Sequence, residues 1–450
     1  MLFHPQSEAD IRAMLEAIGV KDIEELWAQV PARLRLGRDL ELGPPLSEAV
    51  VEREMLAQAE ANRDLKHTLC FLGAGTYFHH VPNLVPALLS RGEFLTAYTP
   101  YQAEVSQGTL QAMFEFQTLI VELTGMEVAN ASMYDGAEAT AEAVLMAGRM
   151  RPKNTNGPVL VSQALNPAYR ATVETYLRHS GREIKTIPLN PDGATDLDRL
   201  RAELPGALCL VAQSPNFFGC IEDWPAIMAA VKDSDLVRIA VVTEALSLAL
   251  LKPPGHCSAD IVGGSGQSFG IPPALGGPHL GFLAGRDADV RRMPGRLVGQ
   301  TADQEGRRGF VLTLSTREQH IRREKATSNI CTNHGLMALA ATIYLARQGG
   351  HGLLRLAKQN HELAERLKQK LAAAGFKPRF SAPGFNEFTI ELGADAQTVA
   401  ERLAGKGILA GLPLGRFFPE LSTCLLIAVT EMLSETDLDQ LVAALAEVKQ

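Results

Sequence analysis

The stretch Gly266-Gln267-Ser268-Phe269-Gly270 has the residue types and spacing of a nucleophile elbow, G-x-S-x-G. In a serine hydrolase this serine attacks an acyl group, and the mechanism requires a helix to start directly after it. Ile271-Pro272-Pro273 follows instead. Consecutive prolines remove N–H donors and push the preceding residue out of helical geometry. The sequence therefore argues against a hydrolase, which stays open as an alternative through Ser268.

Two other chemistries fit these residue types no better. Gly264-Ser265-Gly266 is followed by Gly270 and by no predicted helix, so the glycines lack the spacing of a dinucleotide-binding loop. His79-His80 and His256-Cys257 are isolated pairs without a further ligand at helical spacing. We therefore predict neither a nucleotide loop nor a metal site.

Composition limits the function classes further. The chain has 450 residues, of which 46% are hydrophobic and 21% charged, with a formal net charge of −8. This composition indicates a globular protein and gives no electrostatic footprint for nucleic acid or an anionic membrane. The longest apolar run, residues 239–251, is too short for a membrane span, and no secretory signal is visible, so we expect a cytoplasmic protein. The 6 cysteines form no C-x-x-C pair and indicate reduced thiols.

The elements that must position any site fall into three segments. Residues 1–65 read as a helical arm of the kind that clasps a partner subunit, with capping residues Ser7 and Asp10 at its first helix. Residues 66–326 alternate buried strands, beginning with "CFLGA", and helices, which predicts an α/β domain with a mostly parallel sheet. Residues 327–450 read as a long helix opening at "TSNICTN" and a small α+β domain, whose last helix starts behind Ser434.

A large α/β domain followed by a small α+β domain resembles the layout of pyridoxal-phosphate enzymes of the aspartate-aminotransferase type. Such an enzyme needs an acid after one strand to keep the pyridine nitrogen protonated and a lysine after a later strand to form the Schiff base. The corresponding strand ends carry Thr243-Glu244 and Gln267-Ser268. No lysine occurs from Pro253 to Arg323. The chain therefore has the domain layout of these enzymes but no lysine in the segment where the Schiff base would form.

Several long stretches closely resemble the glycine decarboxylase P-protein family of the glycine cleavage system, in particular its amino-terminal half. They include "TAYTPYQAEVSQGTLQAMFEFQTLIVELTGMEVANASMYDGAEATAEA", "LLKPPG", "GGPHLGF" and the segment from Arg291 to Asn333. The resemblance runs over essentially the whole chain. It implies a pyridoxal-phosphate-transferase fold of type I with a mostly parallel mixed sheet.

The resemblance also implies that this chain is the non-catalytic subunit 1. Matched on Phe269-Gly270-Ile271-Pro272, the lysine of the homologous half falls on Gln267, or on Ser268 if counted from Asp260, and the pyridine acid falls on Thr243. The implied assembly is an α2β2 heterotetramer with subunit 2, which binds pyridoxal 5'-phosphate. The complex decarboxylates glycine, releases CO2 and transfers the aminomethyl group to the lipoyl arm of H-protein. A self-sufficient pyridoxal-phosphate enzyme and a binding protein without enzymatic partners remain alternatives.

The same resemblance identifies one difference from the family and one set of residues that this chain is expected to contribute to the partner's active site. Where the family commonly has Gly-Thr at a phosphate-cradling helix start, this chain has Ala137-Glu138, whose carboxylate repels a phosphate. No cofactor is therefore expected in this chain's own cleft. The residues expected to complete the partner's active site, by analogy with subunit-sharing sites of this fold, are Tyr98, Thr99, Tyr101, Gln102, Glu104, Thr327, Ser328 and Asn329.

Structural alternatives exist for these loops. Thr99 fits the cap of a helix beginning at Pro100, and Thr327 or Ser328 fits the cap of the long helix. The basic cluster of Arg317, Arg322, Arg323 and Lys325 is typical of a solvated or interface surface and less so of a phosphate clamp.

Overall fold

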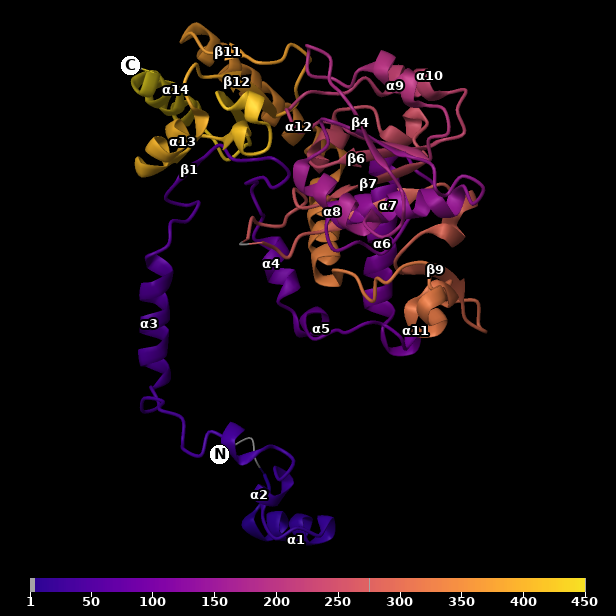
Figure 1. Ribbon diagram of the computed structural model, residues 1–450, viewed down its shortest axis with the longest axis vertical. Coiled ribbons are helices and arrows are strands. Elements are labelled where there is room, and N and C mark those ends of the chain that lie inside the picture. Colours follow the sequence, from indigo (N-terminus) through magenta and orange to yellow (C-terminus); the bar gives the residue numbers. More distant parts are fainter. Residues whose placement is uncertain (1–4, 275, 450) are drawn as a thin grey trace. The chain divides into compact units, whose positions relative to one another are not determined.

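The computed structural model describes residues 5–274 and 276–449, and Figure 1 traces them with their helices and strands labelled. Contacts divide the chain into two compact units, Met1–Arg63 and Asp64–Gln450. No helix in the described part of the chain is both long and apolar enough to cross a membrane. The further division predicted near residue 326 remains a prediction.

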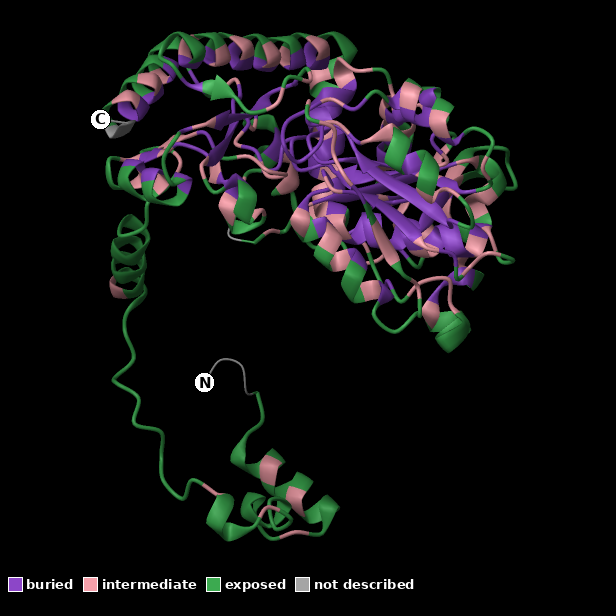
Figure 2. Cartoon of the chain, turned by 45° about the horizontal axis from the view of Figure 1, so that its top comes forward, coloured by how far each residue is buried: buried purple, intermediate pink, exposed green. Residues whose placement is uncertain are grey.

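The first unit contains helices without a core of their own. Its elements are α1 (Glu8–Ile18), α2 (Ile23–Leu26), η1 (Ala32–Leu34) and α3 (Glu48–Glu60). Ser7 and Asp10 form the predicted capping box of α1, which ends at Gly19 with a φ of 87°. Within described residues 5–63, none of these helices has a buried residue, and Figure 2 colours them mostly as exposed. Several leucines of the unit, among them Leu34, Leu36 and Leu42, are exposed.

The second unit is built around a seven-stranded mixed sheet in the order β2-β8-β7-β6-β5-β3-β4. The neighbours from β7 to β4 pair in parallel, while β8 runs antiparallel to both β7 and β2. This confirms the predicted mostly parallel sheet. The strands are β2 (Val128–Ala129), β3 (Val159–Ser162), β4 (Ile184–Ile187), β5 (Cys209–Gln213), β6 (Val237–Val242), β7 (Ile261–Ser265) and β8 (Gly281–Gly285).

Helices cover both faces of this sheet, which is why its strands are continuous apolar runs. Along β5, Leu210 and Ala212 pack into one core cluster, and Cys209 and Val211 pack into the opposite one. In Figure 2 the sheet is coloured as buried throughout its middle. The covering helices are α6 (Gln107–Thr124), α10 (Trp224–Val231) and α12 (Gly335–Ala373) on one face, and α7 (Gly136–Met150) and α8 (Pro167–Leu177) on the other.

Shorter elements connect these layers. They are α4 (Leu84–Leu89), α5 (Gly92–Leu95), η2 (Ala103–Val105), α9 (Leu197–Glu203), η3 (Ala245–Ala249), η4 (Pro254–Cys257), η5 (Asp287–Arg292), the antiparallel pair β9 (Leu297–Ala302) and β10 (Arg308–Thr313), η6 (Ser315–Arg317), α11 (Gln319–Arg322) and η7 (Arg323–Lys325).

A second sheet, in the order β11-β12-β15-β14, forms the carboxy-terminal part of this unit. Its strands and flanking elements are β11 (Lys377–Pro378), β12 (Glu387–Glu391), α13 (Ala396–Gly405), β13 (Ile408–Leu409), β14 (Leu412–Pro413), η8 (Leu414–Arg416), η9 (Pro419–Leu421), β15 (Cys424–Ala428) and α14 (Glu435–Lys449). Ser434 and Asp437 bond each other across the start of α14, as predicted.

Two predictions about elements are wrong. The "CFLGA" segment does not join the large sheet, because β1 (Leu69–Cys70) pairs in parallel with β13. The long helix α12 begins at Gly335 and not at Thr327, and its cap, His334, makes no side-chain capping bond. Thr327 and Ser328 are therefore not helix caps. α12 is also kinked, since Gly349 has a φ of 58° and a ψ of 174° inside it.

Candidate functional site

The stretch after β7 does not support a nucleophile elbow. Residues 267–270 form a turn, and described residues 271–274 have no helical structure, as expected from the prolines. Ser268 is fully buried, and its hydroxyl oxygen has no hydrogen-bond partner among the described residues. A catalytic serine needs a base within hydrogen-bond reach. The geometry thus disfavours the hydrolase alternative.

Gln267 has its whole carboxamide engaged by the backbone. Its Oε1 accepts from the Tyr77 N–H at 2.8 Å, and its Nε2 donates to the Tyr77 carbonyl at 3.0 Å and to the Ile271 carbonyl at 2.6 Å. The side chain is 1% exposed. Gln267 thus joins the end of β7 to a segment that precedes the large sheet in sequence.

Thr243 lies at the same edge of the sheet, directly after β6. Because the carboxyl ends of parallel strands meet at one edge, Gln213 at the end of β5 lies at the same edge as Thr243 and Gln267, which follow β6 and β7. The Thr243 hydroxyl accepts from Nε2 of Gln213 at 3.1 Å. All three side chains are buried and neutral. The edge therefore offers neither an amine nor a carboxylate at these positions.

The segment from Phe71 to His80 packs against this edge. Gly75 approaches so closely that a Cβ on it would lie 3.9 Å from Thr243 Cβ and 3.1 Å from Asn166 Nδ2. Tyr77 is fully buried and donates its hydroxyl to Glu387 Oε2 at 2.6 Å. Burial raises the pKa of the Glu387 carboxyl to about 7. The chain's own backbone thus occupies space beside Thr243 and Gln267.

His79 anchors the end of that segment between two carboxylates. Its Nε2 lies 3.1 Å from Glu244 Oε2 and its Nδ1 lies 2.9 Å from Glu431 Oε2. Burial opposes protonation of the ring, but the two carboxylates outweigh it and raise the pKa of His79 to about 10. The same histidine outweighs the burial of Glu431 and lowers its pKa to about 2. Glu244, the acid next to Thr243, is thereby engaged in a buried ion pair.

The start of α7 presents carboxylates as well. Asp135 caps the helix by accepting from the Glu138 N–H at 2.8 Å, and Glu138 Oε2 accepts from the Tyr134 N–H at 2.9 Å. Burial raises the pKa of Glu138 to about 7. A hollow of about 290 Å³ beside this helix start is lined by residues that include Ala74, Gly75, Thr76, Tyr134, Asp135, Gly136, Ala137, Asn166, Tyr169, His279 and His334.

The loop "YTPYQAE" lies at the surface. Tyr98 is 86% exposed and Tyr101 is 56% exposed. Gln102 and Glu104 are also exposed, and neither lines the cavity that Tyr98 borders. No helix starts at Thr99, because α6 begins only at Gln107, so the capping interpretation of Thr99 is wrong. Most of the loop is exposed, but Thr99 is half-buried and Pro100 is buried.

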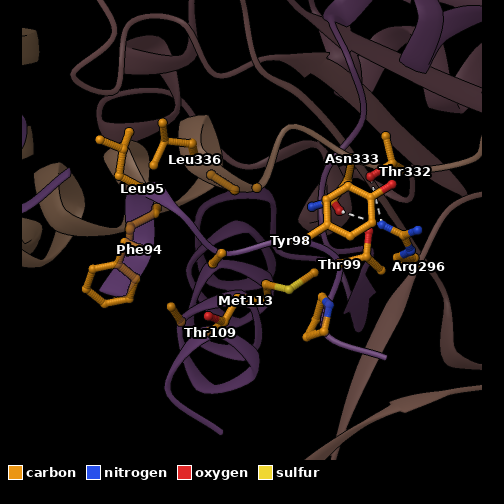
Figure 3. A pocket seen from close by; sticks show the side chains of 16 residues that line it. Phe94, Leu95, Tyr98, Thr99, Thr109, Met113, Arg296, Thr332, Asn333 and Leu336 are labelled. Atoms are coloured by element: carbon orange, nitrogen blue, oxygen red, sulfur yellow. Dashed lines mark hydrogen bonds between the residues drawn. The ribbon is translucent and has the colours of Figure 1, made fainter. Parts of the chain in front are cut away.

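Tyr98 and Thr99 border a cavity of about 270 Å³ at the start of α12. Figure 3 shows its polar side, where Tyr98 and Thr99 lie near Arg296, Thr332 and Asn333, with Phe94, Leu95 and Leu336 on the other side. Arg296, Thr332 and Asn333 were not singled out by sequence reasoning. These three residues lie far from Tyr98 in sequence, so only the folded structure shows that they line the same cavity.

The second predicted loop, residues 327–329, is held by hydrogen bonds to other segments of the chain. The Ser328 hydroxyl donates to Glu142 Oε1 at 2.7 Å, and the Thr327 N–H donates to the Arg317 carbonyl at 2.9 Å. Asn329 is exposed and lines a separate hollow of about 360 Å³ with Asp135 and Glu138. Thr327, Ser328 and Asn329 therefore do not line the cavity that holds Tyr98.

Within the basic cluster, Arg317 differs from its neighbours. It is buried and donates to the backbone carbonyls of Leu314, Met293 and Gly295. Arg322, Arg323 and Lys325 are exposed. Arg317 thus holds backbone together, whereas the other three side chains are open to solvent in the isolated chain.

The fold defines the class of protein. Its sheet and carboxy-terminal domain match those of a sphingosine-1-phosphate lyase from Burkholderia pseudomallei with a TM-score of 0.67 at 18% identity, over 92% of each chain. This is the type I fold of pyridoxal-phosphate-dependent enzymes. A crystal structure of glycine decarboxylase (P-protein) of the glycine cleavage system, in inhibitor-bound form, matches with a TM-score of 0.88 at 45% identity over 100% of both chains.

The sequence places the chain more narrowly. The family model for the glycine cleavage system P-protein matches residues 2–445. A probable glycine dehydrogenase (decarboxylating) subunit 1 from Anaeromyxobacter dehalogenans is 50% identical over 436 residues, covering 96% of this chain and 97% of that protein. A protein of the same description from Rhodospirillum centenum is 51% identical over 453 residues, covering 100% of both. The chain belongs to the glycine cleavage system P-protein family.

Proposed function

We propose that this chain is the subunit of a glycine dehydrogenase (decarboxylating) that lacks the Schiff-base lysine and completes an active site carried by a second subunit. The observation that carries the proposal is Gln267, a neutral side chain whose amide is fully bonded to backbone where the fold needs a reactive amine. Membership of the P-protein family makes glycine decarboxylation the activity to which the chain contributes.

The residues at the strand ends do not fit pyridoxal phosphate in this chain's own cleft. Gln267 has no amine to condense with an aldehyde, and Thr243 has no charge to hold a pyridine nitrogen protonated. Glu244 cannot replace Thr243, because its carboxylate is paired with His79. Asp135 and Glu138 place carboxyl groups at the helix start where a phosphate dianion would need donors. We therefore assign the cofactor to the partner, subunit 2.

Exposed loops support a role at the partner's site. Tyr98 and Tyr101 present phenols at the surface, and phenol groups bond carboxylate or phosphate oxygens. Thr99, Gln102, Glu104, Thr327, Ser328 and Asn329 belong to the same proposal. Of these, Ser328 supports its loop through Glu142, while Asn329 is free to face a partner.

The helical first unit supports the assembly. Within described residues 5–63 its helices bury no side chain, and five exposed leucines occur from the end of η1 to the residue before the cap of α3. These residues are Leu34, Leu36, Leu40, Leu42 and Leu46. Apolar surface of this kind marks a protein interface. We propose that the unit binds subunit 2 in an α2β2 heterotetramer, which acts in the cytoplasm and passes the aminomethyl group to lipoylated H-protein.

Co-expression with a candidate subunit 2 tests the proposal. Glycine–bicarbonate exchange with H-protein should require both chains, and borohydride should trap the cofactor on subunit 2 only. Full exchange by subunit 2 alone would remove the role proposed for this chain. A stoichiometric adduct on this chain, purified alone with the cofactor, would instead favour a self-sufficient enzyme.

A further inference from the structure

Arg296 is a buried arginine directly before β9. It is 2% exposed, and its carbonyl accepts from the Ala131 N–H at 2.9 Å, which holds its backbone in place. A buried guanidinium is costly unless it is paired and hydrogen-bonded. Its Nε lies 3.8 Å from Oε2 of Glu318, which is also buried. The Glu318 carboxylate therefore compensates the charge of Arg296 on the Nε side of the guanidinium.

The other side of the guanidinium connects two loops. Nη2 donates to the Cys331 carbonyl at 2.7 Å and to the Tyr101 hydroxyl at 3.3 Å. Nη1 donates to Thr332 Oγ1 at 2.8 Å and to Asn333 Oδ1 at 3.4 Å. Figure 3 shows Arg296 beside Thr332 and Asn333 at the polar side of the cavity. One side chain thus joins the loop of Tyr101 to the segment before α12.

The contact with Tyr101 extends over its ring. The guanidinium carbon lies 5.6 Å from the Tyr101 ring centroid, and the His320 ring lies 5.8 Å from it, edge to face. The forked donation to both loops requires a planar guanidinium, which a lysine ammonium cannot reproduce. The exposed tyrosine is therefore oriented by a group that is itself shielded from solvent.

We propose that Arg296 is a positioning residue for the shared active site: it sets the Tyr98–Tyr101 loop and the Cys331–Asn333 segment in one arrangement facing subunit 2. This inference rests on the proposed function and deepens it. In this role Arg296 acts through Tyr101 and Thr332.

The test uses the full heterotetramer. Arg296→Lys keeps the charge beside Glu318 but loses the fork, so kcat for exchange, per assembled complex, should fall about 100-fold, as small misplacements near a site do. KM for glycine should change far less. Arg286→Lys is the matched control, because the Arg286 guanidinium likewise donates to more than one acceptor, the carbonyls of Gly255 and Ala259, but contacts neither loop. It should leave kcat unchanged.

A double-mutant cycle separates positioning from general stability. If Arg296 acts through the tyrosine, Tyr101→Phe combined with Arg296→Lys should cost no more than Arg296→Lys alone. Multiplicative losses, or a kcat for Arg296→Lys equal to that of Arg286→Lys, would overturn the inference.

If Arg296→Lys does not assemble, Thr332→Val removes one acceptor and leaves the Glu318 pair in place. Its kcat should fall, and wild-type rates for both Thr332→Val and Tyr101→Phe would then overturn the inference. A wild-type chain that adds nothing to exchange would overturn the proposed function itself, a result distinguishable from either of these.

Discussion

Gln267 and Tyr77 form a two-point hydrogen-bonded pair, in which the Gln267 carboxamide bonds both the N–H and the carbonyl of Tyr77, at 2.8 and 3.0 Å. Tyr77 in turn bonds Glu387. The position that resembles the Schiff-base lysine of a sister chain thus links the large sheet, through the Phe71–His80 segment, to the carboxy-terminal sheet.

Replacing Gln267 with lysine should not create a cofactor site. The chain alone, incubated with pyridoxal phosphate and borohydride, should give no more trapped adduct on Gln267→Lys than on Gln359→Lys, a control on the exposed side of α12. The substitution leaves the Tyr77 carbonyl and N–H without their partner, which costs about 1–3 kcal/mol each in the free energy of unfolding. A stoichiometric adduct on Lys at 267 with unchanged stability would contradict this prediction.

The His79 ion pairs make stability depend on pH. Since the folded pKa of His79 is about 10 against an ordinary 6.5, its contribution is complete below pH 6.5 and is lost as pH rises through 10. Since the folded pKa of Glu431 is about 2 against 4.5, the contribution from the acid side is complete above pH 4.5 and is lost as pH falls through 2.

His79→Gln should therefore destabilise the chain most between these limits, near pH 5 to 6, by about 3–5 kcal/mol, as removal of one partner from a buried pair does. The loss should shrink toward pH 10. Urea unfolding across this range, with exposed His256→Gln as the control, measures it. A loss that is independent of pH would show that the histidine is neutral in the folded chain.

Substitutions of Ser328 and Asn329 should distinguish a residue that supports its own loop from one that contacts the partner subunit. Ser328→Ala removes the 2.7 Å bond to Glu142, a fully buried carboxylate, and should lower the free energy of unfolding of the chain alone by about 1–3 kcal/mol. Asn329→Ala, at an exposed neighbour, should leave unfolding unchanged and lower exchange in the complex. The reverse pattern would assign Ser328 to the partner's site and Asn329 to structure.

The exposed leucines of the first unit should matter only for assembly. Leu42 is 79% exposed and Leu46 is 53% exposed. Their replacement by alanine should leave thermal unfolding of the isolated chain unchanged but weaken binding to subunit 2 by more than about 1 kcal/mol each, as interface anchors do. Glu41→Ala is the neighbouring control. Titration calorimetry with subunit 2 gives the comparison, and equal affinities for all three variants would place the interface elsewhere.

The expected fold follows from local patterns. Continuous apolar runs predicted the buried strands of the large sheet, and capping residues such as Ser7 and Ser434 located helix starts, because both signals act within a few residues. The same local reasoning failed at β1, whose short apolar run does not reveal that its partner is β13, more than three hundred residues away. It also failed at α12, where residues 327–334 bond Glu142, Arg296 and Arg317 instead of extending the helix.

The sequence by itself determined the family and the absence of a lysine from Pro253 to Arg323, because both can be read without coordinates. Only the tertiary structure decided what Gln267 bonds and what holds the exposed loops. Tyr77 meets Gln267, and Arg296 meets Tyr101, across 190 and 195 residues of chain. Buried polar groups must find partners wherever the packing places them, and that choice depends on the whole fold and not on local sequence.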